Sequence, residues 1–126
     1  GGEPTLYNLD PLCQRLKEKD LKTYLETAGT GDYTGIWDWI CLSPKKQSPA
    51  RPEFYHRADE LKVIVHEPDD FHWAEEAARQ VGPHCRLYLQ PEWSRYQQMI
   101  PSIVDYVKQH SQWQVSLQAH KFMRIP

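Results

Sequence analysis

Short apolar runs recur along the chain, separated by segments of helical spacing or by loops. They predict five strands, over residues 21–26, 37–42, 61–65, 86–90 and 113–118. A short, nearly continuous apolar run is typical of a strand that is buried on both faces of a parallel sheet. Residues 43–52 hold three prolines and predict a loop. The pattern therefore predicts an α/β fold whose strands are mostly parallel.

Apolar residues at helical spacing, together with start signals, predict three helices. The first follows Pro11, which suits the first turn of a helix. The second begins at Asp69 or Asp70, either of which can cap it. The third covers residues 96–110, and Pro101 within it predicts a kink or a second start. These helices would cover the faces of the sheet.

Composition and charge exclude several classes of protein. A chain of 126 residues is long enough for one domain with a core. A net charge of -2 gives no reason to expect nucleic acid or an anionic membrane as a partner. No apolar run approaches the ~20 residues that a membrane helix needs. Cys13, Cys41 and Cys85 have neither disulfide nor metal-ligand spacing, so we expect reduced thiols and a cytoplasmic location.

Hydrogen-bonding side chains follow every predicted strand at its carboxyl end. They lie in residues 26–30, 43–45, 66–67, 90–91 and 118–120. Ligands of parallel sheets bind at this edge, although purely structural domains also place polar residues there. The hydroxyl of Ser43 can bind a ribose, and the ammonium of Lys45 can pair with a carboxylate. Either residue could equally begin a solvated loop, and His120 alone could be an ordinary surface histidine.

The opening segment Gly1-Gly2-Glu3-Pro4 also allows two interpretations. It can be a turn before a helix. Alternatively, the glycines let backbone groups approach a ligand closely, while Glu3 accepts a hydrogen bond from an ammonium group. Because a helix follows this turn directly, we expect a further strand and its crossover upstream of Gly1.

Together these segments resemble one enzyme family in their order and spacing. The matching segments are residues 1–4, 26–30, 38–45, 60–62, 89–91 and 115–126. The opening segment is similar to the glycine–glutamate motif of radical S-adenosylmethionine (SAM) enzymes. The Ser-Pro-Lys segment and the closing Ser-Leu-Gln-Ala-His-Lys segment are more specific, and they resemble 7-carboxy-7-deazaguanine synthase. The resemblance implies a partial (β/α) barrel of the radical SAM type, with residues 1–126 as the C-terminal portion of its single domain.

The resemblance also implies the cofactors and the reaction. The family uses a [4Fe–4S] cluster, SAM and Mg²⁺ to contract the ring of 6-carboxy-5,6,7,8-tetrahydropterin on the route to queuosine. A reductant such as flavodoxin and a homodimer are expected. Because the chain lacks the cysteine spacing of the cluster, we expect the ligands of the cluster and of Mg²⁺ in an N-terminal part outside this sequence. The chain alone should then be inactive, and its open sheet should aggregate or dimerise.

The resemblance assigns site residues, one by one, to positions of this sequence. The expected SAM-binding residues are Gly2, Glu3, Ser43, Pro44, Lys45, Gln90, Pro91, Glu92 and Trp93. His120 and the terminal carboxylate of Pro126 would face the pterin, since a carboxylate can accept two adjacent N–H bonds in a fork. Ala28 and Ala119 stand where the family commonly has Asn and Thr, so each could cost one contact.

Two other functions remain open at this point. A glycyl-radical-activating enzyme shares the cluster and the glycine motif but acts on a partner protein. A non-catalytic binding module derived from the barrel would have lost the cluster altogether.

Overall fold

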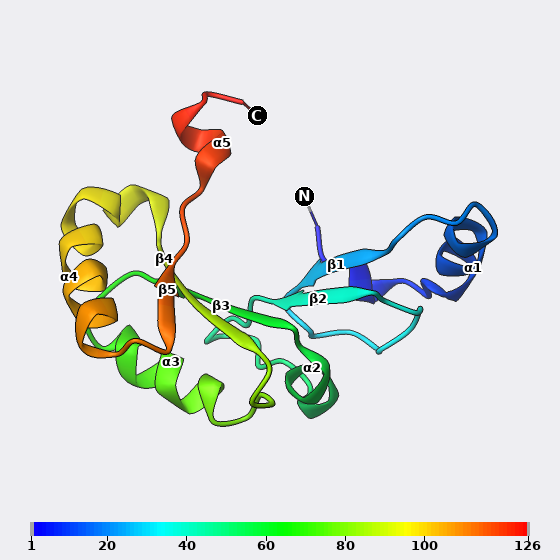
Figure 1. Cartoon of the computed structure of the whole chain (residues 1–126), viewed down its shortest axis with the longest axis horizontal. Coiled ribbons are helices and arrows are strands. Elements are labelled where there is room, and N and C mark those ends of the chain that lie inside the picture. The colour runs from blue at the N-terminus through cyan, green and yellow to red at the C-terminus, as the bar shows by residue number, and fades with distance from the viewer. Residues whose placement is uncertain (1, 126) are drawn as a thin grey trace.

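The computed structural model describes residues 2–125, and its centre is a five-stranded sheet (Figure 1). The strands are β1 (Tyr24–Thr27), β2 (Trp39–Leu42), β3 (Glu60–Val65), β4 (Arg86–Pro91) and β5 (Trp113–Val115). Their order in the sheet is their order in the chain, and every neighbouring pair is parallel. The predicted α/β class with parallel strands is therefore confirmed.

The three predicted helices are present, together with shorter ones. The helices are η1 (Pro4–Leu6), α1 (Asp10–Glu18), α2 (Pro52–Arg57), α3 (Asp70–Ala78), η2 (Trp93–Arg95), α4 (Tyr96–Gln109) and α5 (Ala119–Phe122). The second start predicted at Pro101 does not occur, because α4 runs on through this exposed residue. The short helix α2 was not predicted, although Pro52 occupies its first position, which proline favours.

Helices cover one face of the sheet. In Figure 1, α2 and α3 lie on one side of the strands, and both ends of the chain lie on the other. Leu42, Leu61 and Val63 are fully buried on the covered face, where they join Phe54 of α2 and Ile103 of α4 in the core. Burial of apolar surface on this face supplies the main force that holds the layers together.

The opposite face is polar and partly exposed. Exposure alternates along β1, β2 and β3, as it does in strands with one buried face. The register places Glu26, Cys41, Glu60 and Arg86 side by side in one row across four strands. The prediction that the strand within residues 37–42 is buried on both faces is wrong, because Trp39 and Cys41 are partly exposed on a side that none of the helices described covers.

None of the helices in residues 2–125 is long and apolar enough to cross a membrane.

Candidate active site

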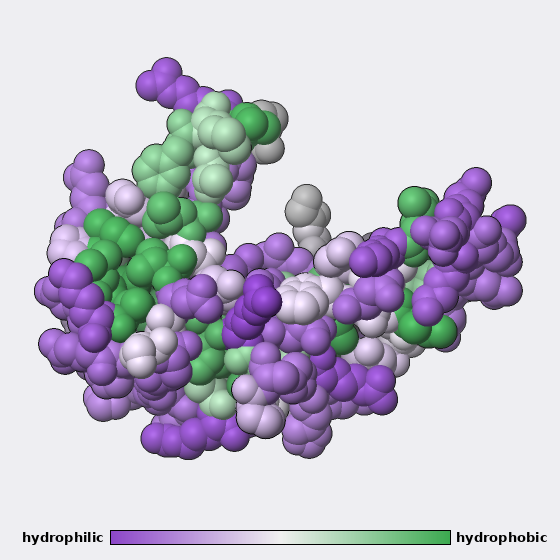
Figure 2. Space-filling view, viewed as in Figure 1, coloured by the Kyte–Doolittle hydropathy of each residue, from purple (hydrophilic) through white to green (hydrophobic). Residues whose placement is uncertain are grey.

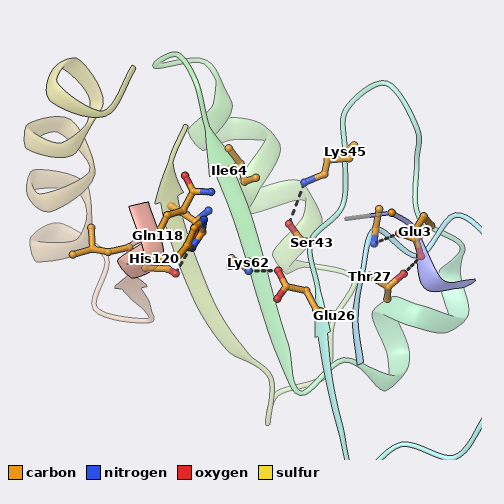
Figure 3. A pocket seen from close by; sticks show the side chains of 14 residues that line it. Glu3, Glu26, Thr27, Ser43, Lys45, Lys62, Ile64, Gln118 and His120 are labelled. Atoms are coloured by element: carbon orange, nitrogen blue, oxygen red, sulfur yellow. Dashed lines mark hydrogen bonds and ion pairs between the residues drawn. The ribbon is translucent and has the colours of Figure 1, made fainter. Parts of the chain in front are cut away.

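A cavity of about 540 Å³ opens on the polar face of the sheet, at the carboxyl ends of the strands. Figure 2 shows the molecule hollowed between its C-terminal segment and the rest of the chain. The cavity is lined by Gly2, Glu3, Glu26, Thr27, Ala28, Ser43, Lys45, Lys62, Ile64, Gln90, Ser116, Leu117, Gln118 and His120. Every strand or the segment after it contributes (Figure 3). Residues predicted at the ends of β1, β2, β4 and β5 meet here, whereas His66 and Glu67 after β3 lie outside the lining.

Glu3 attaches the opening segment to the end of β1. Its Oε1 accepts hydrogen bonds from the Thr5 backbone N–H at 3.1 Å, the Thr5 hydroxyl at 2.6 Å and the Thr27 hydroxyl. Its Oε2 accepts one bond, from the Ala28 backbone N–H at 2.8 Å. Because a carboxylate oxygen has two lone pairs, Oε2 can accept one further donor from the cavity.

The environment of Glu3 favours its charged form. Burial raises the pKa of Glu3, but hydrogen bonds from Thr27, Thr5 and Ala28 outweigh burial, so the pKa lies below the usual 4.5. The carboxylate is therefore ionised at neutral pH and presents a negative charge at one end of the cavity.

The glycine-rich loop after β1 completes this attachment. The Thr27 hydroxyl accepts a bond from the Gly29 N–H at 2.9 Å, and the Thr5 hydroxyl accepts one from the Gly31 N–H at 3.0 Å. A Cβ atom on Gly31 would lie 1.9 Å from the carbonyl oxygen of Thr5. Only glycine therefore lets the loop approach η1 this closely.

The segment after β2 places a cation in the cavity. The Lys45 ammonium lies 3.3 Å from the hydroxyl of Ser43, which is almost fully buried. Burial and the neighbouring charge of Lys62 both lower the pKa of Lys45. Figure 3 shows the side chains of Ser43 and Lys45 facing the cavity from the end of β2. Pro44 is fully buried beneath them and does not line the cavity.

An ion pair between Lys46 and the buried Asp70 holds the far end of the segment after β2. Asp70 is 3% exposed, and its Oδ2 accepts bonds from the backbone N–H groups of His66, at 2.7 Å, and Glu67, at 3.1 Å. The Lys46 ammonium contacts the other oxygen. Burial raises the pKa of Asp70, but Lys46 and the two backbone donors outweigh burial, so the pKa lies below its usual value of 3.8. The loops after β2 and β3 are thereby tied together.

Glu26 and Lys62 form an ion pair on the floor of the cavity. Glu26 was among the polar strand-end residues expected from the sequence, but it was given no role, and Lys62 was missed. The pair joins β1 to β3 (Figure 3). The Lys62 side chain is mostly buried, with 18% exposed, whereas 66% of Glu26 is exposed. A lysine inside the apolar run of residues 61–65 was the available signal, since it must face the uncovered side of the strand.

The segment after β5 forms the other wall. Gln90 is buried at the end of β4, and its Oε1 accepts a bond from the Ser116 hydroxyl at 3.1 Å. Gln118 and His120 line the cavity beyond it. Ala28 also lines the cavity, whereas Ala119 is exposed and lies outside the lining.

Three further residues expected at the SAM site lie outside the cavity lining. Pro91 is buried as the last residue of β4. The Glu92 carboxylate caps η2 by accepting the Ser94 N–H at 2.9 Å. Trp93 packs against Tyr96 at 5.9 Å between ring centroids, beside a separate hollow of about 400 Å³. Pro126 lies outside the residues that the structure describes.

The residues present fit SAM but provide no cluster site. The cavity offers a carboxylate, a hydroxyl and an ammonium, which complement the charged and polar groups of SAM. Within residues 2–125, no three His, Cys, Asp or Glu side chains gather as metal ligands. Burial raises the pKa of Cys41 to about 11 and that of Cys85 to about 12, so both stay protonated thiols. Iron–sulphur clusters need thiolates.

The chain is similar over its whole length to proteins named 7-carboxy-7-deazaguanine synthase. It is 48% identical to one from Flavobacterium psychrophilum over 126 residues, which is 100% of this chain and 60% of that protein. It is 46% identical to one from Synechocystis sp., over 99% of this chain and 60% of that protein. The resemblance stated from the sequence is confirmed, and the chain spans about 60% of the length of these relatives.

The fold has a counterpart among solved structures. QueE from Escherichia coli matches with a TM-score of 0.82 over 94% of this chain and 54% of that chain. At 24% identity this match supports the fold alone. No protein-family model matches the sequence.

Proposed function

We propose that the chain is the C-terminal portion of a 7-carboxy-7-deazaguanine synthase, a radical SAM lyase that contracts 6-carboxy-5,6,7,8-tetrahydropterin. The observation that carries this proposal is the cavity, because all five strands or the segments after them line it, with the charges that these two ligands need. The names of the relatives favour the synthase over a glycyl-radical-activating enzyme and over a non-catalytic binding module. When bound, the reduced cluster and SAM supply a radical that removes hydrogen from the pterin.

The Glu3 side of the cavity suits SAM. The free capacity of Glu3 Oε2 can accept a bond from the methionyl ammonium, and Gly2 lets the backbone approach it. Lys45 can pair with the methionyl carboxylate, and Ser43 can bind a ribose hydroxyl. The buried Gln90 can donate its amide N–H groups to the same ligand.

The His120 side suits the pterin. A pterin carries adjacent N–H donors on its pyrimidinone edge and a carboxylate on the other ring. Lys62, on the floor of the cavity, can pair with this carboxylate. His120 and the terminal carboxylate of Pro126 would complete this end.

Several parts of the proposal concern the protein beyond these residues. We assign the ligands of the [4Fe–4S] cluster and of Mg²⁺ to a part outside this sequence. The isolated chain should then be inactive. We also propose a cytoplasmic homodimer that takes electrons from a reductant such as flavodoxin.

The test measures reductive cleavage of SAM by the full-length gene product after reconstitution with iron and sulphide. We expect 5′-deoxyadenosine to form with dithionite and to increase when 6-carboxy-5,6,7,8-tetrahydropterin is added. Formation that requires a protein partner and ignores the pterin would favour the glycyl-radical-activating enzyme. A colourless, iron-free protein that leaves SAM intact would end the radical SAM proposal.

A further inference from the structure

The chain ends in an arm, residues 116–125, that leaves the sheet after β5. Figure 1 shows this C-terminal arm projecting from β5, away from the helices below the sheet. At its base, the Ser116 N–H donates to the Leu89 carbonyl at 2.8 Å. Beyond that residue, the backbone hydrogen bonds found for the arm join its own residues, among them Lys121 to Gln118 and Ile125 to His120. Backbone pairing therefore does not fix the position of the arm against the body.

At the base of the arm the Ser116 hydroxyl donates to Gln90, and further along it Phe122 makes aromatic contacts with the body. The Phe122 ring meets Trp93 edge-on, at 5.2 Å and an interplanar angle of 85°. It meets Tyr96 at 5.1 Å and 73°. Edge-to-face contacts at these distances are the favoured geometry of aromatic pairs. Phe122 is 50% exposed, and the other large apolar side chains of the arm, at positions 117, 123 and 125, are exposed to a similar degree or more. What distinguishes Phe122 is therefore its ring contacts with the body and not its burial.

The same short helix carries His120, which lines the cavity, and Phe122, which packs on the body. Residues two positions apart on a helix point roughly 200° apart. One side of α5 therefore faces the cavity while the other faces Trp93 and Tyr96.

We propose that Trp93, Tyr96 and Phe122 form an aromatic anchor that positions His120 and Gln118 over the cavity. Trp93 is then a positioning residue for the wall that the proposed function gives to the pterin, instead of a contact to SAM. The part of this inference that names the pterin rests on the proposed function. The attachment of the arm does not rest on it, and the two can be tested separately.

Limited proteolysis of the full-length gene product measures how firmly the C-terminal arm is attached to the body. Lys121 and Arg124 are trypsin sites within the arm, and Trp93→Ala leaves the sequence around both unchanged. We expect Trp93→Ala to speed cleavage at these sites about ten-fold, because one of the two aromatic contacts that hold Phe122 is lost. Tyr24→Ala removes an exposed aromatic side chain at the far edge of the sheet and serves as the control. An unchanged cleavage rate in Trp93→Ala, with an unchanged melting temperature, would overturn the anchor.

The effect of the anchor on the position of His120 and Gln118 is tested by the KM values of Trp93 variants for the pterin and for SAM. Trp93→Ala should raise the KM for the pterin about ten-fold and leave the KM for SAM unchanged, and Trp93→Phe should restore most of the loss by keeping a ring. An equal rise in both KM values would show that Trp93 serves the SAM end and would contradict the inference. If the wild-type protein does not turn over the pterin, the proposed function fails, and proteolysis still decides whether the anchor exists.

Discussion

Replacing Glu3 by Gln tests whether the opening segment is held as the structure indicates. The change turns one carboxylate oxygen into an NH₂ donor. If the NH₂ replaces Oε2, it faces the Ala28 N–H; if it replaces Oε1, it faces the donors of Thr5 and Thr27. Either orientation sets donor against donor, so at least one hydrogen bond is lost at the end of β1.

The magnitude follows from the number and kind of these bonds. A hydrogen bond to a charged group contributes about 1.5–3 kcal/mol when buried. Glu3 is only partly buried, whereas its partners Thr5 and Thr27 are 3% exposed. We therefore expect Glu3→Gln to lower the free energy of unfolding by about 2 kcal/mol, which corresponds to a fall in Tm of about 8 °C for a domain of this size.

The assay is thermal and urea unfolding of Glu3→Gln, with Glu92→Gln as the control. Glu92 makes the same local pair of bonds, to the N–H and hydroxyl of Ser94, but lacks the long-range bonds to Thr27 and Ala28. The variant Glu92→Gln should lower the free energy of unfolding by less than about 0.5 kcal/mol, because Glu92 is a helix cap whose hydrogen bonds are exposed. Equal losses in the two variants would refute the reasoning.

The same bonds predict a pH dependence. Because the folded protein lowers the pKa of Glu3, its stabilisation is complete above the usual value of 4.5. The stabilisation is lost as the pH falls from there through the lower folded pKa. The difference in stability between the wild type and Glu3→Gln should therefore shrink below pH 4.5 and stay constant between pH 6 and 8.

Three further predictions concern the cavity and its walls. Lys45→Ala should weaken SAM binding about ten-fold in equilibrium dialysis, because a charge-assisted bond is lost, and unchanged affinity would remove Lys45 from the site. Gly31→Ala should destabilise the protein by about 3 kcal/mol in urea unfolding, because the new Cβ would meet the Thr5 carbonyl; wild-type stability would contradict this packing. Residues added after Pro126 should raise the KM for the pterin more than the KM for SAM, and an equal effect on both would show that the terminus has another role.

Much of the fold could be predicted from the apolar runs. The errors concern the uncovered face of the sheet and the shortest helices. The runs and the long connections between them predicted the parallel sheet. The runs also suggested burial on both faces, yet Cys41 and Lys62 face a side that this part of the chain leaves open. Apolar residues such as Trp39 and Ile64 also occur on that side, which hid the alternation. The short α5 was missed because four residues carry no helical period.

The candidate site was predicted in part, because strand ends are visible in a sequence and side-chain directions are not. Gly2, Glu3, Ser43, Lys45, Gln90 and His120 all line the cavity. The resemblance gave Glu92 and Trp93 a place at the SAM site, but here the first caps η2 and the second packs against Phe122. The partnership of Trp93 with a residue 29 positions later depends on tertiary packing, which no local pattern reports.

The most direct test of the central claim is the product. The reconstituted full-length gene product is incubated with dithionite, SAM and 6-carboxy-5,6,7,8-tetrahydropterin, and mass spectrometry follows the pterin. We predict a product with the mass of 7-carboxy-7-deazaguanine that requires SAM. Recovery of the unchanged pterin from an iron-loaded protein that cleaves SAM would contradict the proposed function.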